Sequence, residues 1–198
     1  MSGKPQYDEA AVIAAAMQVF WRHGYAAASI NDLTAATGLS RSSIYQRFGD
    51  KEGLFRAALD DYTGRVLRRM NAVEGAGARG RVEALLRDFL PKEEAAARPA
   101  GCLLVRSCAE KADLPEAART AVLDGVGAQY AIFARILRQG VENGELPAAA
   151  DVDVLAWYYL GILHSLLNLP QAGATPAALA GMVAIAMAAW PAGAGAGA

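Results

Sequence analysis

The sequence predicts an all-α protein with about nine helices, because of its composition and its lack of strand-like patterning. Alanine and leucine dominate the 198 residues, and no segment shows sustained alternation of apolar and polar positions. Apolar residues make up 54% of the chain, which is enough for the full core of one or two domains. The 19 basic and 20 acidic residues nearly cancel, so a nucleic acid partner would need a local site.

The first two helices are predicted from their capping residues and from the glycines that follow them. The first begins after Asp8, whose carboxylate can accept hydrogen bonds from free amides, and ends near Gly24. Ser29 and Asp32 form a capping box that opens a second, shorter helix. Gly38 ends that helix, because glycine readily adopts a positive φ.

Two more helices follow after short turns. Ser40 caps a short helix that places Ile44 and Phe48 four residues apart on one face. Asp50 caps the next helix, which we expect to continue to about Asn71. The N-terminal region therefore contains a longer helix, two short helices separated by a glycine turn, and a long fourth helix.

The remaining helices are predicted from apolar periodicity and from proline and glycine breaks. The glycine-rich stretch 74–80 is expected to be a loop, and the Gly-Ala repeat at 192–198 a disordered tail. The segment 152–169 is apolar on nearly every face, which predicts that it is buried on two sides. The helices of this half are expected at 81–91, 102–111, 113–143, 152–169 and 176–190.

Residues 29–48 match the geometry of a helix-turn-helix, in which the second helix enters the major groove of DNA. The apolar side chains of this segment would pack the unit together and leave the polar residues of the second short helix outside. Arginine can donate twice to guanine, glutamine can pair with adenine, and serine can serve either base. The same spacing would also suit a three-helix packing unit with a solvated polar face, so spacing alone leaves both interpretations open.

A long, ordered series of short motifs runs along about residues 10–60: Phe20-Trp21-Arg22-His23-Gly24-Tyr25, Ser29-Ile30, Thr37-Gly38-Leu39-Ser40, Ser43-Ile44-Tyr45, Phe48 and Asp50-Lys51-Glu52-Gly53-Leu54-Phe55. This series closely resembles the N-terminal signature of TetR family transcriptional regulators. Ser42 stands where the family most often has glycine, and Thr34 where a small alanine is usual. Because the match is long and ordered, the resemblance implies a DNA-binding head at residues 1–55.

The resemblance also implies roles for individual residues. Ser29 would contact a phosphate at the amino end of its helix, Tyr45 a phosphate or a thymine methyl group, and Lys51 the DNA backbone. Tyr45 could instead be a half-buried aromatic residue that covers the core, and Lys51 a solvated surface charge. The complete predicted DNA-binding set is Ser29, Ser40, Arg41, Ser42, Ser43, Tyr45, Gln46, Arg47 and Lys51.

The same resemblance implies that residues 56–191 form a helical ligand-binding and dimerisation domain. The stretches 101–104 and 140–146 resemble segments found in one broad group of the family. Independently, the apolar segments 152–169 and 176–190 could supply two helices per subunit to a four-helix bundle, although both could also be intramolecular core. The predicted interface residues are Leu155, Leu163, Leu166, Met182, Val183 and Ala186.

A small-molecule inducer is expected to bind among the helices from 81 to 169, in a mainly apolar pocket with a few polar anchors. The candidate lining residues are Phe89, Arg106, Tyr130, Phe133, Trp157, Tyr158, Tyr159 and His164. Taken singly, such residues more often belong to a core or an interface. Cys102 is a candidate sensor of oxidants or electrophiles, and a small core residue in the alternative interpretation.

The expected function is that of a homodimeric repressor which binds a palindromic double-stranded DNA operator and leaves it when an inducer binds. The sequence contains no phosphate-cradling glycine motif, no zinc-protease motif and no Cys-x-x-Cys pair, so we expect no enzyme activity, metal or cofactor. The N-terminus lacks the apolar core of a secretory signal and no segment makes a convincing membrane helix, which predicts a cytoplasmic protein without a membrane partner. The competing class is a helical interaction module or thiol enzyme that shares the N-terminal fold.

Overall fold

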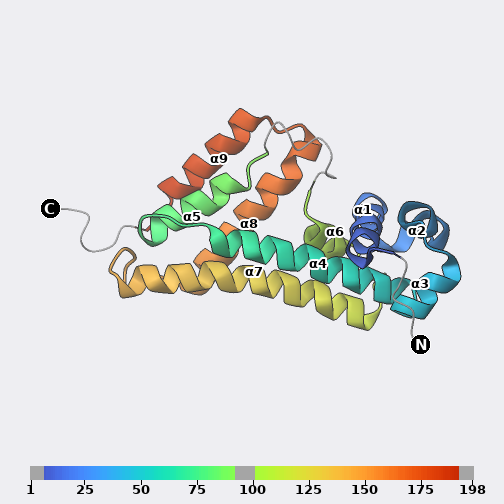
Figure 1. The fold of residues 1–198 in the computed structure, drawn as a ribbon. Coiled ribbons are helices and arrows are strands. Elements are labelled where there is room, and N and C mark those ends of the chain that lie inside the picture. The colour runs from blue at the N-terminus through green and yellow to red at the C-terminus, as the bar shows by residue number, and fades with distance from the viewer. Residues whose placement is uncertain (1–6, 92–100, 192–198) are drawn as a thin grey trace. The chain divides into compact units, whose positions relative to one another are not determined.

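The computed structural model describes residues 7–91 and 101–191, and all regular structure in these ranges is helical (Figure 1). The predicted all-α fold class is therefore confirmed, whereas the expected tail at 192–198 lies outside the described residues. The elements of the described chain are α1 (Glu9–Ala27), α2 (Ile30–Thr37), α3 (Arg41–Phe48), α4 (Lys51–Ala72), α5 (Gly77–Asp88), α6 (Leu103–Ala109), α7 (Glu116–Glu142), α8 (Val152–Asn168), the short 3-10 helix η2 (Leu169–Ala172) and α9 (Pro176–Ala188).

Two compact units divide the chain, and neither is continuous in sequence. The first comprises Met1–Arg65 and Leu103–Gly125, and the second comprises Val66–Cys102 and Val126–Ala198. Helices α4 and α7 each contain a point at which the chain passes from one unit to the other. The first unit thus combines the N-terminal helices with α6 and the start of α7, while the functional boundary at residue 55 stays a prediction.

Local capping interactions determine where the first helices begin and end. Asp8 accepts a hydrogen bond from the Ala10 amide at 3.0 Å. Ser29 Oγ accepts from the Asp32 amide at 3.1 Å while the Asp32 carboxylate accepts from the Ser29 amide at 2.9 Å, which is the predicted capping box. Gly38 ends α2 with a φ of 71°, in the left-handed region that glycine tolerates.

An aromatic cluster lies in the core of the first unit. The rings of Phe20 and Tyr25 in α1 each lie 5.0 Å from the ring of Phe55 in α4, and the rings of Trp21 and Tyr62 lie 5.0 Å apart. Edge-to-face pairs of this kind contribute about 0.5–1.5 kcal/mol each beyond the burial of ring area. These pairs hold the first half of α4 against the C-terminal part of α1.

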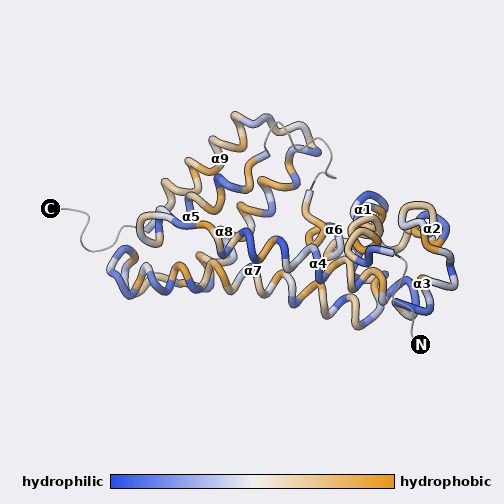
Figure 2. Tube along the Cα trace, viewed as in Figure 1, coloured by the Kyte–Doolittle hydropathy of each residue, from blue (hydrophilic) through white to orange (hydrophobic). Residues whose placement is uncertain are grey.

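In the second unit, α5, α8 and α9 pack together, and α7 contributes Phe133 to the same core. Tyr159 of α8 is fully buried, and its ring stacks on that of Phe133 at 6.4 Å. Figure 2 shows that α9 is apolar along most of its length, whereas α3 in the first unit is mostly hydrophilic. A helix with apolar residues all round has no face suited to water, so α9 is expected to be covered on more than one side.

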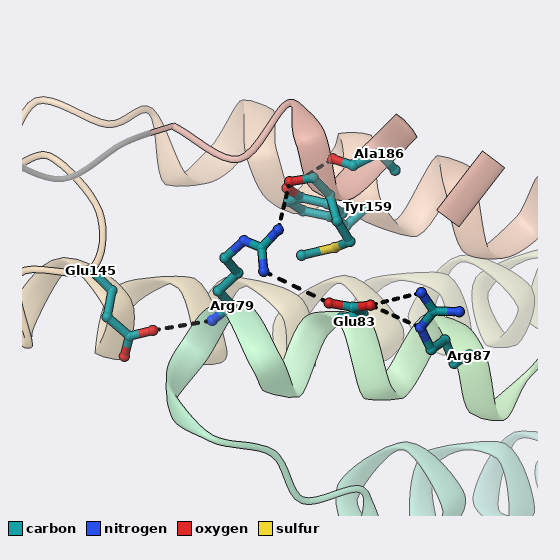
Figure 3. A network of polar contacts seen from close by, with 7 residues as sticks. Arg79, Glu83, Arg87, Glu145, Tyr159 and Ala186 are labelled. Carbon is teal, nitrogen blue, oxygen red and sulfur yellow. Dashed lines mark hydrogen bonds and ion pairs between the residues drawn. The ribbon is translucent and has the colours of Figure 1, made fainter. Parts of the chain in front are cut away.

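A polar network connects α5 to the turn that follows α7 and to α9 (Figure 3). The Glu145 carboxylate accepts hydrogen bonds from the Ala78 amide at 2.8 Å and from the Arg79 amide at 3.2 Å, at the amino end of α5. The Arg79 side chain donates to the Met187 carbonyl at 3.3 Å and lies 3.8 Å from the Glu83 carboxylate. Helix α5 is therefore joined to α9 through Arg79 and to the turn after α7 through Glu145.

The Glu145 contact explains why the prediction of a loop across 74–80 is wrong in its second half. Helix α5 begins at Gly77, inside the stretch expected to be loop. The N-cap residue is Ala76, which makes no side-chain capping bond, so no local signal marks the start. Glu145, 67 residues from Ala78 in sequence, supplies the cap, and its negative charge suits the positive end of the helix dipole.

Candidate nucleic-acid interface

Helices α2 and α3 form the predicted helix-turn-helix, and α3 exposes most of its polar side chains. Leu33 of α2 and Ile44 of α3 are fully buried, so these apolar residues anchor the pair within the first unit. Ser43 is half-buried. The exposed residues of α3 are Arg41, Ser42, Tyr45, Gln46 and Arg47.

Three serine hydroxyls gather at the amino end of α3. Ser40 Oγ accepts a hydrogen bond from the Ser43 amide at 3.1 Å and lies 2.8 Å from the hydroxyl oxygens of both Ser42 and Ser43. The amino end of a helix has a partial positive charge, and hydroxyl groups there can donate to a phosphate oxygen or to a base edge. Because Ser40 and Ser42 are exposed, this end of α3 is open to such a partner.

The two arginines of α3 have different surroundings. Arg47 donates to the Glu9 carboxylate of α1 from Nε at 2.7 Å and from Nη2 at 2.8 Å, and the hydrogen bonds to Glu9 raise the pKa of the Arg47 guanidinium. Arg41 makes a longer contact of 3.3 Å with the Asn31 side chain, which adds Asn31 to the predicted polar surface. Arg41 is therefore the more available of the two for a base, whereas Arg47 links α3 to α1.

Tyr45 and Ser29, two further predicted contact residues of the head, differ in how readily their side chains could contact DNA. Tyr45 is exposed over 43% of its surface, so its ring and hydroxyl are accessible. Ser29 is exposed as well, but its hydroxyl donates to Asp32 Oδ2 at 2.6 Å, and this bond lowers the pKa of Asp32. A phosphate contact by the Ser29 hydroxyl would therefore compete with the capping box.

Lys51 is held at the start of α4 by two groups from the end of α1. Its Nζ lies 4.5 Å above the centroid of the Tyr25 ring and donates to the Ala26 carbonyl at 3.4 Å. Desolvation lowers the pKa of Lys51, and the charge of Glu110 acts in the opposite direction. An ammonium fixed at the amino end of a helix is suited to contact a phosphate. Tyr25 is a site residue that the predicted set lacks.

The predicted ligand residues do not converge on one place. Phe133 and Tyr159 are fully buried, and Phe89 is buried with the Arg69 guanidinium 4.1 Å from the centroid of its ring. These three aromatic residues belong to the core of the second unit. Arg106 belongs instead to the first unit, where its Nε lies 3.4 Å from the Glu110 carboxylate.

Three further aromatic candidates lie at or near the surface of the second unit. Trp157 is 50% exposed and Tyr158 is 38% exposed. The Tyr130 ring packs against the Trp157 ring at 4.7 Å, and its hydroxyl donates to the Asp153 carboxylate at 2.6 Å. Such partly exposed rings are better suited to a protein interface than to an enclosed ligand site.

His164, another predicted ligand residue, pairs with the side chain of Gln129 in the second unit. Its Nε2 lies 2.9 Å from Gln129 Oε1, and burial lowers the pKa of His164 to about 4, so the imidazole is neutral at pH 7 and donates to Gln129. Gln129 is fully buried, and its Nε2 has no hydrogen-bond partner among the described residues. A single glutamine within a long helix gives no sequence signal, which explains its absence from the predicted set.

Four of the predicted interface residues are core residues of a single subunit: Leu163, Leu166, Val183 and Ala186. A side chain with no exposed surface in its own subunit cannot contact a partner, so these four assignments are corrected. Leu155 and Met182 are partly buried. The large hydrophobic side chains that α8 and α9 expose are instead Val154 at 59%, Trp157 at 50%, Tyr158 at 38% and Ile185 at 73%.

Three further features bear on thiol chemistry, on metal binding and on a membrane location. Cys102 is 1% exposed, and its amide donates to the Asn168 side chain at 3.3 Å, a setting that favours the core interpretation over the sensor. Within residues 7–91 and 101–191, no group of three His, Cys, Asp or Glu side chains could hold a metal ion. In the same ranges, Val152–Ala172 is long and apolar enough to cross a membrane by length and composition, a test that core helices also pass.

Two family models match most of the chain. Residues 12–58 match the family described as bacterial regulatory proteins, tetR family. Residues 77–186 match a tetracyclin repressor-like C-terminal domain. The first match covers the helix-turn-helix and Lys51, and the second covers the helices from α5 to most of α9.

Relatives and solved structures agree with these family models. The chain is 32% identical over 203 residues to the HTH-type transcriptional repressor ComR of Escherichia coli, covering 96% of this chain and 92% of that protein. It is 26% identical over 176 residues to the HTH-type transcriptional regulator TtgR of Pseudomonas putida, covering 84% and 83%. A solved complex of a cysteine mutant of the TetR family regulator CifR with 26-bp operator DNA is 34% identical, with a TM-score of 0.83, and covers 96% of this chain and 100% of that chain. The chain belongs to the TetR family of bacterial regulatory proteins.

Proposed function

We propose that this chain is a transcriptional repressor that binds a palindromic DNA operator as a homodimer and releases it when a small molecule binds. The observation that supports this most is the exposed polar surface of α3, with Arg41, Gln46 and the serine hydroxyls at its amino end. Arginine and glutamine are suited to guanine and adenine edges in the major groove. The structurally similar CifR variant was solved with operator DNA bound.

Within this proposal, the residues of the head divide into two groups. Arg41 and Gln46 read bases, while Lys51 and Tyr45 contact the backbone and set the register of the protein on the duplex. Residues 1–70 hold nine basic and seven acidic residues, which is only a small positive surplus. Affinity for phosphate should therefore depend on a few well-placed groups, and its dependence on salt should be modest.

The proposed head comprises residues 1–55, and residues 56–191 provide the ligand and dimer functions. Helix α4 begins with Lys51 and continues past Arg65 into the second unit, so it can connect a bound ligand with the backbone contact. A ligand can shift the spacing of the two heads only by its difference in affinity for the two states. We assign the polar anchor of the ligand to Gln129 and His164, because an acceptor atom would satisfy the buried amide donor of Gln129.

Selection of bound duplexes from random-sequence DNA tests the proposal directly. We expect an inverted repeat, because two identical heads related by a two-fold axis read the same half-site on opposite strands. Compounds can then be screened for release of the selected duplex. If the protein binds no duplex at low salt, the proposal fails and a helical interaction module becomes the better description. The proposal places the protein in the bacterial cytoplasm, where the chromosome lies, and assigns it no enzyme activity.

A further inference from the structure

We propose that Glu110 is a positioning residue for the backbone contact of Lys51, a role that rests on the proposed DNA-binding function. Glu110 directly follows α6 in the first unit and is 85 residues from Tyr25 in sequence. Its Oε2 accepts a hydrogen bond of 2.8 Å from the Tyr25 backbone amide. The end of α6 is therefore joined to the end of α1, where Lys51 is also held.

Gly24 provides the space that the Glu110 carboxylate occupies. Its φ of 79° and ψ of 173° turn the chain out of the regular part of α1, a conformation that L side chains rarely adopt. A Cβ atom on Gly24 would lie 2.0 Å from Glu110 Oε1. Residue 24 is therefore suited to glycine for two reasons, the backbone conformation and the close approach of this carboxylate.

Tyr25 connects the Glu110 hydrogen bond with the Lys51 ammonium. Its backbone amide binds Glu110, and its ring lies under Lys51 Nζ. The second group that holds Lys51, the carbonyl of Ala26, belongs to the next residue along the chain. Loss of the carboxylate would leave the Tyr25 amide without this acceptor and would free the short segment that fixes the ammonium.

The negative charge of Glu110 and its proposed positioning role would affect DNA binding in opposite directions. A carboxylate in the first unit, which also contains the proposed DNA contacts, repels phosphates, so its removal should strengthen binding if its charge were its only contribution. A positioning role predicts weaker binding on removal, because Lys51 would no longer be held in a fixed geometry towards the phosphate. The direction of the change therefore separates the two roles. Arg106, whose Nε lies 3.4 Å from Glu110, is a second neighbour of the carboxylate and is left unchanged in the test.

Three substitutions at one position separate geometry from charge. Glu110→Gln keeps an oxygen acceptor at the same reach and removes the charge, whereas Glu110→Asp keeps the charge and shortens the reach. Glu110→Ala removes both. Asp60→Ala is the matched control, because Asp60 is an exposed acid of α4 in the same unit and its loss changes the net charge equally. Each variant is titrated with a duplex selected by the wild-type protein, at several salt concentrations.

We expect Glu110→Ala and Glu110→Asp to bind about tenfold more weakly, which corresponds to one hydrogen bond to a charged group. The salt slope, which is the steepness with which log K falls as log[salt] rises, should decrease by about 0.9 for each phosphate that the variant no longer neutralises. Glu110→Gln should bind like the wild type or slightly more tightly, and Asp60→Ala should do the same. Adding Glu110→Ala to Lys51→Ala should weaken binding no further, since both substitutions act on the same interaction with the phosphate.

Several results would overturn the role of Glu110. One is wild-type or tighter binding by both Glu110→Ala and Glu110→Asp, and another is weak binding by Glu110→Gln together with normal binding by Glu110→Asp. If Glu110→Ala proves unfolded by circular dichroism, the Gln and Asp variants decide the question alone. If the wild-type protein selected no duplex, the proposed DNA-binding function itself would be contradicted. This outcome differs from those above, in which the wild type binds DNA and only the role of Glu110 fails.

Discussion

Single side chains of the head are placed for different kinds of DNA contact. Lys51→Ala should weaken binding to all duplexes about equally and lower the salt slope by about 0.9 per phosphate, because a phosphate carries no sequence information.

Arg41→Ala should relax the preference at one base position, at a cost of about 1–3 kcal/mol in binding free energy. Titrations of the selected operator and of its single-base variants, across a range of salt concentrations, measure both effects.

Lys111→Ala is the control for the loss of a positive charge, because Lys111 is exposed in the same unit and lies outside the predicted contact set. It should leave the base preference unchanged and alter the salt slope less than Lys51→Ala does. A Lys51→Ala protein that changed its preference at particular base pairs, with an unaltered salt slope, would contradict the assignment of Lys51 to the backbone.

His164 should make the stability of the protein depend on pH. Burial lowers the pKa of the imidazole from 6.5 to about 4, so below pH 6.5 the unfolded chain binds a proton that the folded protein does not. The free energy of unfolding should therefore be highest above pH 6.5 and should fall by about 3 kcal/mol in total as the pH drops towards 4. Urea unfolding at pH 7.5 and pH 5 should show a steeper loss for the wild type than for His164→Gln. Equal losses in the two proteins would show that His164 is not the titrating group.

The residues that could be predicted from sequence are those whose partners are close along the chain. The Ser29–Asp32 capping box spans three residues, so its pattern is visible in the sequence itself. The Tyr25 amide and Glu110 are 85 residues apart, and Gln129 and His164 are 35 apart. Only the folded chain brings such pairs together, and a single glutamate or glutamine has no local signature.

The same distinction holds for whole helices. Helices α1 to α4 each begin after a residue whose side chain accepts a backbone hydrogen bond, and the sequence predicts these starts from Asp8, Ser29, Ser40 and Asp50. Helix α5 begins inside a glycine-rich stretch that favours a loop, and its cap comes from Glu145. Long-range capping therefore overrides the local preference of the segment from Gly77 to Gly80.

Glu145→Ala should lower the free energy of unfolding by about 1–2 kcal/mol, as for the loss of a helix cap. Two backbone amides at the start of α5 would lose their acceptor, and the favourable charge at the helix end would disappear. Urea unfolding followed by circular dichroism measures the change. Glu142→Ala is the matched control, because Glu142 is an acid at the C-terminal end of α7, where a negative charge is unfavourable. If the two variants were equally stable, the cap would contribute nothing measurable.

For the molecule as a whole, the sequence predicts two apolar helices but does not show which of their faces is buried within one subunit. Leu163 and Val183 lie on the faces of α8 and α9 that are buried within one subunit, whereas Trp157 and Ile185 lie on exposed faces of the same helices. Both faces are apolar, so the periodicity of the sequence fits either orientation. Exposed apolar side chains on two neighbouring helices are typical of a surface that pairs with a partner, which supports dimerisation through α8 and α9.

Ile185→Glu should separate the two subunits without unfolding either of them. Ile185 is 73% exposed in the subunit, so a carboxylate at this position is solvated in the monomer and desolvated only in the dimer. An unpaired buried charge costs about 3–5 kcal/mol, which weakens association by more than about a hundredfold. Light scattering should therefore give the mass of one chain, while circular dichroism stays helical.

The variant should also lose specific operator binding more than nonspecific binding, because specific binding needs two heads at a fixed spacing. Leu163→Glu provides the contrast: Leu163 is fully buried within the subunit, so this variant should unfold. Leu123→Glu is the control, because Leu123 is 54% exposed in the first unit and the change should leave the dimer intact. If Ile185→Glu remained dimeric and bound the operator normally, the subunits would have to associate through a surface other than the exposed face of α9.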